Sequence, residues 1–131
     1  MKRKKDGLTK RRVNYFLSKI YKLLYDDSCQ VRWKKNLKYG GEECLALYDP
    51  AEADGDDIIW LSATGKNDLV NSIIHECLHA LYNDFSEAEI ELLADQICEK
   101  MSAVQYAHLI VALAENLKQH YPSDFKKGIT S

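Results

Sequence analysis

Two histidines and a glutamate stand at a spacing that suits metal chemistry, in the segment His75-Glu76-Cys77-Leu78-His79. On an α-helix, side chains four residues apart lie on the same face, one turn apart, so the two imidazoles can bind one cation. Glu76 lies beside them, where a carboxylate can reach a water held by that cation. This is the H-E-x-x-H arrangement, which supplies two zinc ligands and a general base. We therefore expect Zn²⁺ bound by His75 and His79, with Glu76 as the catalytic base.

The residues around the histidines predict an amphipathic helix. Apolar side chains recur at helical spacing and form one stripe: Val70, Ile74, Cys77, Leu78 and Leu81. The two histidines fall at the margin of that stripe, so one side of the helix can pack into a core while the other faces a cleft. The alternative interpretation is a pair of ordinary core or surface histidines with a glutamate between them by chance.

A second helix is predicted just downstream, and it carries the candidates for a third ligand. Ser86-x-x-Glu89 is a capping box, and a short turn makes the helix that follows an antiparallel neighbour of the histidine helix. Its acidic residues Glu87, Glu91 and Asp95 share one stripe at four-residue spacing. This stripe can face the two histidines, although a solvated helix face is the alternative.

Zinc in a hydrolytic site has three protein ligands and one open position for water. We expect Glu91 to be the third ligand, since it stands about two turns into its helix, with Glu87 as the alternative one turn earlier. Asp95 can accept a hydrogen bond from the free ring N–H of a ligating histidine, which would fix its tautomer.

The two segments together resemble a known group. His75-Glu76-Cys77-Leu78-His79 followed by Glu91-Leu92-Leu93-Ala94-Asp95 is similar to the paired helices of the gluzincin, or thermolysin-like, metallopeptidases. The resemblance implies that Glu91 is the third zinc ligand and that Asp95 supports a histidine. The short spacing between the motifs resembles the compact ImmA/IrrE-type and phage-encoded minimal zincins. The resemblance covers about residues 58 to 101. The chain departs from the group in two ways: we recognise neither the large downstream domain of thermolysin nor a helix-turn-helix segment.

Composition places this chain among intracellular single-domain proteins. Its 131 residues suffice for one core, and a formal net charge of −2 does not indicate a polyanion-binding protein as a whole. Four widely spaced cysteines without a C-x-x-C pair, behind a basic N-terminus with no apolar segment, are expected to be reduced. We therefore expect a cytoplasmic protein without a membrane segment, whose oligomeric state the sequence leaves open.

The predicted fold class is α+β, a minimal zincin-like domain over residues 13–122. It consists of an N-terminal helix ending near Tyr25, a small three-stranded mostly antiparallel sheet, and then the zinc-site, third-ligand and C-terminal helices. The strands are expected at residues 29–33, 43–48 and 58–61, the first two forming a hairpin around Gly40-Gly41. Residues 1–12 are predicted to be a basic flexible terminus and residues 123–131 a flexible tail. The basic terminus leaves nucleic-acid binding open, although a solvated terminus is the favoured interpretation.

These features favour a zinc-dependent endopeptidase that uses a metal-activated water. Its peptide substrate is expected to bind as an extended strand along an edge strand formed by Ile58, Ile59, Trp60 and Leu61. The donor that stabilises the oxyanion could be Tyr82, Tyr106, His108 or His120. Two alternatives stay open: another metal-assisted amide hydrolase such as a deformylase, with Cys44 as third ligand, and a structural-zinc module that binds protein or nucleic acid.

Overall fold

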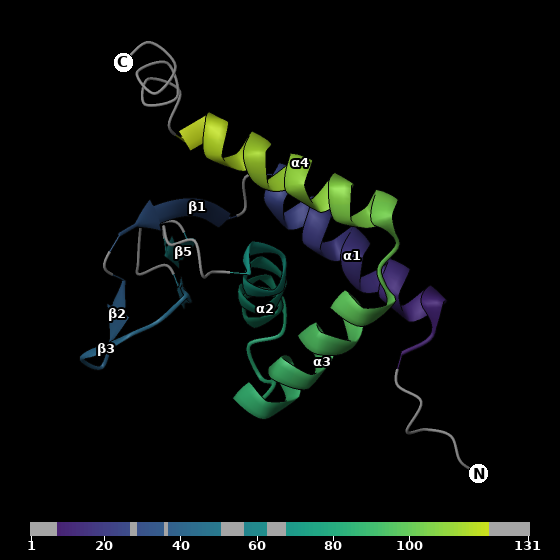
Figure 1. Cartoon of the computed structure of the whole chain (residues 1–131), viewed down its shortest axis with the longest axis horizontal. Coiled ribbons are helices and arrows are strands. Elements are labelled where there is room, and N and C mark those ends of the chain that lie inside the picture. The colour runs from purple at the N-terminus through teal and green to yellow at the C-terminus, as the bar shows by residue number, and fades with distance from the viewer. Residues whose placement is uncertain (1–7, 27–28, 36, 51–56, 63–67, 121–131) are drawn as a thin grey trace.

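A computed structural model describes residues 8–26, 29–35, 37–50, 57–62 and 68–120 of the chain. Within these ranges it contains four helices: α1 (Lys10–Tyr25), α2 (Leu69–Leu81), α3 (Glu87–Lys100) and α4 (Ala103–His120). Its strands are β1 (Cys29–Lys34), β2 (Lys38–Tyr39), β3 (Glu42–Glu43), β4 (Ala46–Asp49) and β5 (Asp57–Ser62). The α+β class and all four predicted helices are confirmed (Figure 1).

The order of the strands differs from the prediction. The main sheet has the order β1-β5-β4, with β1 parallel and β4 antiparallel to β5. The sheet is therefore mixed rather than mostly antiparallel, and the predicted hairpin between residues 29–33 and 43–48 is wrong. The prediction that Ile58, Ile59, Trp60 and Leu61 form an edge strand is also wrong, because β5 is the central strand.

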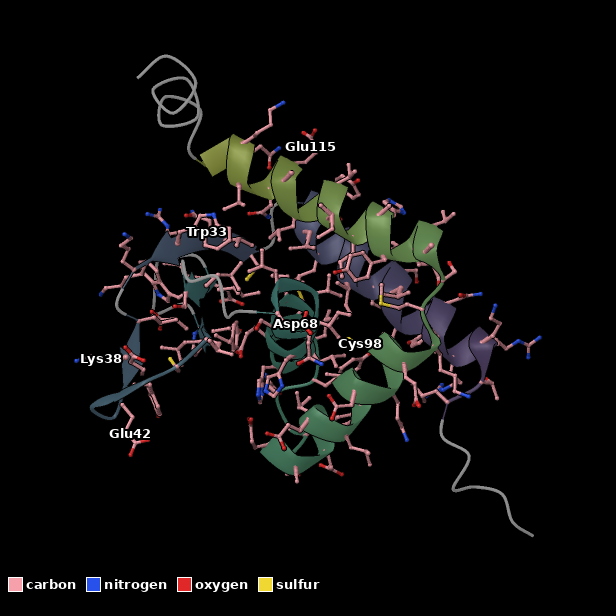
Figure 2. The ribbon with its side chains drawn as sticks, viewed as in Figure 1. Trp33, Lys38, Glu42, Asp68, Cys98 and Glu115 are labelled. Carbon is pink, nitrogen blue, oxygen red and sulfur yellow. The ribbon has the colours of Figure 1, made fainter. Side chains whose placement is uncertain are left out.

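A separate small hairpin occupies the glycine turn. β2 and β3 pair through Lys38↔Glu43 and Tyr39↔Glu42, and Gly40 and Gly41 have positive φ angles of 64° and 85°. Two successive residues with positive φ are the mark of a tight hairpin turn, which glycine adopts without strain. The turn signal in the sequence is thus satisfied locally. Figure 1 shows the hairpin at one end of the molecule beyond the main sheet, and Figure 2 labels its residues Lys38 and Glu42.

The core lies between the main sheet and the helices. α2 contacts both β4 and β5, while α4 packs against α1 and β1. The largest side chains without solvent exposure come from all of these layers, for example Leu17, Ile20 and Leu24 of α1, Ile73, Ile74 and Leu78 of α2, Ile59 and Leu61 of β5, and Leu109 of α4. α2, which carries the histidines, is thereby packed on several sides.

One buried polar side chain ties the core together. The Asn116 side chain accepts the Val31 N–H at 2.9 Å, and its amide donates to the carbonyls of Leu24 and Cys29 at 2.9 and 2.8 Å. Since leaving a buried polar group without a partner costs about 1–3 kcal/mol, these bonds fix the start of β1 against α1 and α4. β1 in turn aligns β5 through its parallel register.

The chain ends are only partly covered by the structure. α1 begins at Lys10, where the Thr9 side chain accepts the Arg12 N–H, so the helix starts inside the predicted flexible segment 1–12. Residues 1–7 and the predicted tail 123–131 lie outside the described residues. No helix in the described part of the chain is long and apolar enough to span a bilayer.

Candidate metal centre

Helix α2 presents its two histidines at the border between core and solvent. The helix begins after Asp68, whose side chain accepts the Asn71 N–H at 3.3 Å. The apolar side of α2 is buried in the core, and its residues Ile73, Ile74, Cys77 and Leu78 all have 0% exposure. This stripe fixes the rotation of α2 about its axis. His75 and His79 are consequently half-buried on the neighbouring face, with ring centroids 4.9 Å apart.

A capped turn brings the start of α3 back to these histidines. The Tyr82 and Phe85 rings stack at 5.2 Å, and the Phe85 N–H donates to the Tyr82 carbonyl. Ser86 then caps α3: its side chain accepts the Glu89 N–H, and the Glu89 carboxylate accepts the Ser86 N–H. This confirms the predicted capping box, and it makes Glu87 the first residue of α3, beside the last turns of α2.

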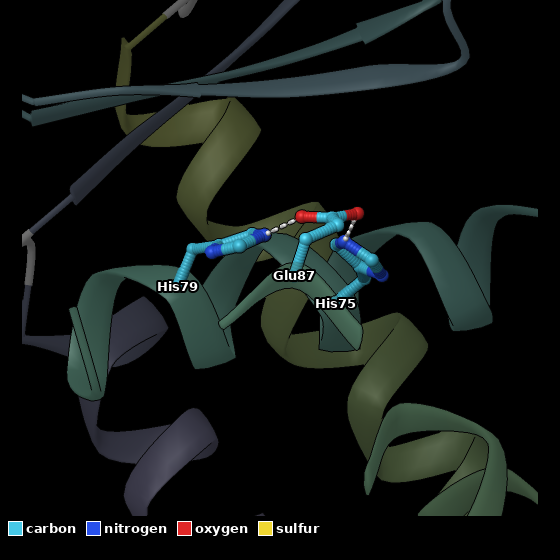
Figure 3. Close-up of side chains that lie close together, drawn as sticks. All are labelled: His75, His79 and Glu87. Atoms are coloured by element: carbon cyan, nitrogen blue, oxygen red, sulfur yellow. Dashed lines mark hydrogen bonds and ion pairs between the residues drawn. The ribbon is translucent and has the colours of Figure 1, made fainter. Parts of the chain in front are cut away.

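The Glu87 carboxylate lies between the two imidazoles (Figure 3). Its Oε2 is 3.0 Å from His75 Nε2 and its Oε1 is 2.8 Å from His79 Nε2. One ligand atom from each of the three side chains lies within 4.8 Å of the others. With zinc–ligand bonds of 2.0–2.2 Å, tetrahedral donors stand ~3.3–3.5 Å apart. The two histidine–carboxylate distances of 3.0 and 2.8 Å are slightly shorter than this, so the carboxylate would move outward by a few tenths of an ångström to admit the ion. Two imidazoles and one carboxylate are also a donor set that zinc accepts, so these residues fit the metal.

The residue at this position is Glu87 and not Glu91, the one expected from the sequence. α3 begins with Glu87 directly after the short turn, so its first turn lies beside His79, while Glu91 stands one turn farther along and is exposed. Asp95 likewise has another partner, since its Oδ1 accepts the Asn71 amide at 3.1 Å instead of a ring N–H of His75 or His79. That bond joins α3 to α2 one turn before His75.

Glu76 is the buried acid of the site, with 8% of its surface exposed. Burial, reinforced by the negative charge of Glu87, raises the pKa of Glu76 to about 7, although a hydrogen bond from the Tyr48 backbone N–H opposes the shift. The backbone bond ties Glu76 to β4. A carboxyl with a pKa near neutrality can both take up and release a proton at physiological pH.

A pocket of about 370 Å³ opens in front of these residues. Its lining comes from the site helices and from the segment before β5: Tyr39, Cys44, Ala46, Leu47, Tyr48, His75, Glu76, His79 and Glu87. Three of the four predicted oxyanion donors, Tyr82, Tyr106 and His108, are not in this lining. Tyr82 packs between Phe16 and Phe85, and His108 stacks on Tyr21 at 4.1 Å. Tyr106 is exposed on α4, and the side chain of His120 lies outside the described residues.

Sequence reasoning missed Tyr39, which lines the pocket from the β2–β3 hairpin. A signal for it was present: Tyr39 directly precedes the Gly40-Gly41 turn, where an exposed aromatic residue has no core to join. Cys44 also lines the pocket, but it is outside the group of three donor atoms. All four cysteines are free thiols.

An α+β domain with a His₂Glu group at the junction of two successive helices is the class that the fold and the geometry define. No protein-family model matches the chain, and neither a curated protein nor a solved structure matches it.

The raised pKa of Glu76 predicts a pH-dependent stability. The unfolded carboxyl loses its proton near pH 4.5 and the folded one near 7, so the folded state binds more protons between these values and stability falls as pH rises through this window. Metal-free Glu76→Gln protein should therefore be more stable than wild type at pH 8, by at most about 3 kcal/mol at 1.36 kcal/mol per pKa unit. Near pH 4.5 this electrostatic advantage should vanish.

Urea unfolding of chelator-treated protein at both pH values measures the change, with exposed Glu115→Gln as control. A Glu76→Gln protein whose advantage over wild type is equal at both pH values would contradict the prediction.

Proposed function

We propose that this protein is a zinc-dependent endopeptidase. The observation that supports the proposal is the Glu87 carboxylate, which lies within 3.0 Å of the Nε2 atoms of both His75 and His79. The buried acid Glu76 adjoins this group on the same helix and lines the same pocket. Three protein donors that leave one metal position open for water, with a carboxyl beside them that can accept a proton, form an arrangement suited to metal-assisted hydrolysis.

The roles of the side chains follow from their positions. His75, His79 and Glu87 would hold the metal, which when bound lowers the pKa of a coordinated water to about 7. Glu76 is placed to accept a proton at the start of hydrolysis and to return it to the leaving amine, because its carboxyl lines the pocket beside the three donors. The Tyr48 N–H holds the Glu76 carboxylate in place during both transfers.

The peptide would bind along β4 rather than along β5. β4 pairs with β5 on one side and has no strand on its other side within the described ranges. Three of its residues, Ala46, Leu47 and Tyr48, line the pocket. The Tyr48 N–H is already bonded to Glu76, so an extended peptide would add its hydrogen bonds at other backbone groups of β4 and so lay a peptide bond across the pocket.

Cys44 gives the two rival functions a concrete test. In a deformylase-like site a cysteine would take the place of Glu87, whereas a structural zinc would be closed by four protein ligands. Cys44 lines the pocket and is the candidate for either role. The endopeptidase proposal therefore expects that Cys44→Ala leaves zinc content unchanged.

Metal analysis combined with a peptide-library digest tests the proposal. We expect one zinc per chain, cleavage of internal peptide bonds, loss of cleavage after chelation and recovery after zinc is restored. Zinc that is bound without cleavage, and that is lost in Cys44→Ala, would establish the structural module instead. Removal of N-terminal formyl groups without internal cleavage would identify the deformylase alternative.

A further inference from the structure

We propose that the β2–β3 hairpin is the outer wall of the substrate pocket and that Tyr39 is a specificity residue. In this role the Tyr39 ring packs against a large apolar side chain of the peptide next to the cleaved bond. The inference rests on the proposed function, because it assigns the substrate preference of that same site.

The pairing of the hairpin determines which side chains turn toward the pocket. Cross-strand partners share a face, and residues two apart along a strand share it too. The Cys44 N–H donates to the Leu37 carbonyl, so the ladder of Tyr39↔Glu42 and Lys38↔Glu43 continues to this pair. Leu37, Tyr39, Glu42 and Cys44 therefore lie on one face, and Lys38 and Glu43 on the other.

The face that carries Tyr39 is the inner one. Leu37 is buried at 4% exposure, which anchors the base of the hairpin, and Cys44 lines the pocket at the same level. Tyr39 stands one step farther out on this face and lines the same pocket, yet 70% of its surface is exposed. A ring that borders a pocket without being packed by the protein leaves its apolar surface available to a bound molecule.

The chemistry of the pocket matches an apolar peptide side chain. One part of the lining is polar and holds the catalytic group, namely His75, Glu76, His79 and Glu87. The remaining part is made of Tyr39 and Cys44 from the hairpin segment and of Ala46, Leu47 and Tyr48 from β4. A peptide lying along β4 thus has its reacting bond over the polar part, and a neighbouring side chain can reach the Tyr39 ring. Aromatic contacts of this kind contribute beyond the area that they bury.

Binding of two hydroxamates to the zinc-loaded protein tests the assignment without relying on turnover. Acetohydroxamate and 3-phenylpropanohydroxamate share the metal-binding group and differ in the phenyl arm. We expect wild type to bind the phenyl compound about tenfold more tightly than acetohydroxamate. In Tyr39→Ala this ratio of the two affinities should fall by a factor of about three to ten, which is the contribution of an aromatic contact. Tyr39→Phe should keep it, since the ring and not the hydroxyl makes the contact.

Tyr106→Ala is the matched control, because Tyr106 is an exposed tyrosine on α4 outside the pocket lining. In the library digest, Tyr39→Ala should raise KM for peptides with a large apolar residue beside the cleaved bond and leave kcat nearly unchanged. A Tyr39→Ala protein with the wild-type preference, or a Tyr39→Phe protein that loses it, would overturn the assignment while zinc-dependent cleavage persists. A wild type that neither holds zinc nor cleaves would instead refute the proposed function, and the inference with it.

Discussion

Glu76→Gln protein is expected to cleave peptides with a kcat about 10²- to 10⁴-fold below that of wild type, the usual contribution of a general acid–base residue. Glutamine has nearly the same shape as glutamate, and its carbonyl oxygen can still accept the Tyr48 N–H. It cannot accept a proton and return it. The loss should therefore fall on the chemical step, and KM should change little.

The measurement needs zinc content and activity on the same samples. Glu76 is not among the three donors of the metal group, so Glu76→Gln should keep its zinc. Glu99→Gln, an exposed carboxylate near the end of α3, serves as a control with the same chemical change away from the pocket. Cleavage by Glu76→Gln at the wild-type rate would remove Glu76 as the base.

The predicted loss of activity has a counterpart in stability. Burial holds Glu76 in its protonated form to about pH 7 in the metal-free protein. Ionisation of this carboxyl above that pH lowers the free energy of unfolding. Glutamine removes this cost, and the inactive variant is expected to be the more stable one in the metal-free state. A residue that lowers stability and is needed for turnover indicates a functional site.

The sequence predicted the parts of the site that depend on local signals. His75, Glu76 and His79 stand on one helix, and an apolar stripe determines which way that helix faces. Ser86 and Glu89 start α3 through bonds between residues three apart, so the capping box can be recognised without the rest of the fold. The helix positions followed from such signals.

The parts that were wrong depend on how distant segments meet. The pairing of β1 with β5 joins residues nearly thirty positions apart, and the choice between a local hairpin and this parallel pair depends on the packing of the whole core. A short apolar run such as residues 58–61 fits an edge or a central strand equally well by pattern. The pattern alone therefore favoured β5 as the substrate strand, whereas the strand order leaves β4 at the edge.

The choice between Glu87 and Glu91 shows the same limit within one helix. Both residues lie on the same face of α3, one turn apart, so the periodicity of the sequence cannot separate them. Their difference arises from the length of the Tyr82–Ser86 turn, which places the first residue of α3 level with His79. A turn of another length would have brought a different carboxylate to the histidines.

Glu87→Gln is therefore expected to weaken zinc binding by at least about 100-fold, while Glu91→Gln should bind zinc within about threefold of wild type. The amide removes the negative charge that the cation meets between His75 and His79, and even indirect support of a metal ligand is worth about 10–100-fold in affinity. Competition with a chromogenic chelator measures both affinities. The two variants are matched, because both are exposed glutamates of α3 that change in charge and not in size.

Circular dichroism of the metal-free proteins should show the same helix content for both, since neither carboxylate belongs to the capping box. A reversed order of affinities would mean that α3 docks about one turn farther along α2 when the metal is bound, which would bring Glu91 to the histidines. Because Asp95 bonds to Asn71 in the present docking, such a shift would also break that contact. Asn71→Ala would then leave zinc affinity unchanged or raise it. With the docking described here, Asn71→Ala should instead weaken zinc binding, because the loss of the bond to Asp95 lets α3 move relative to α2.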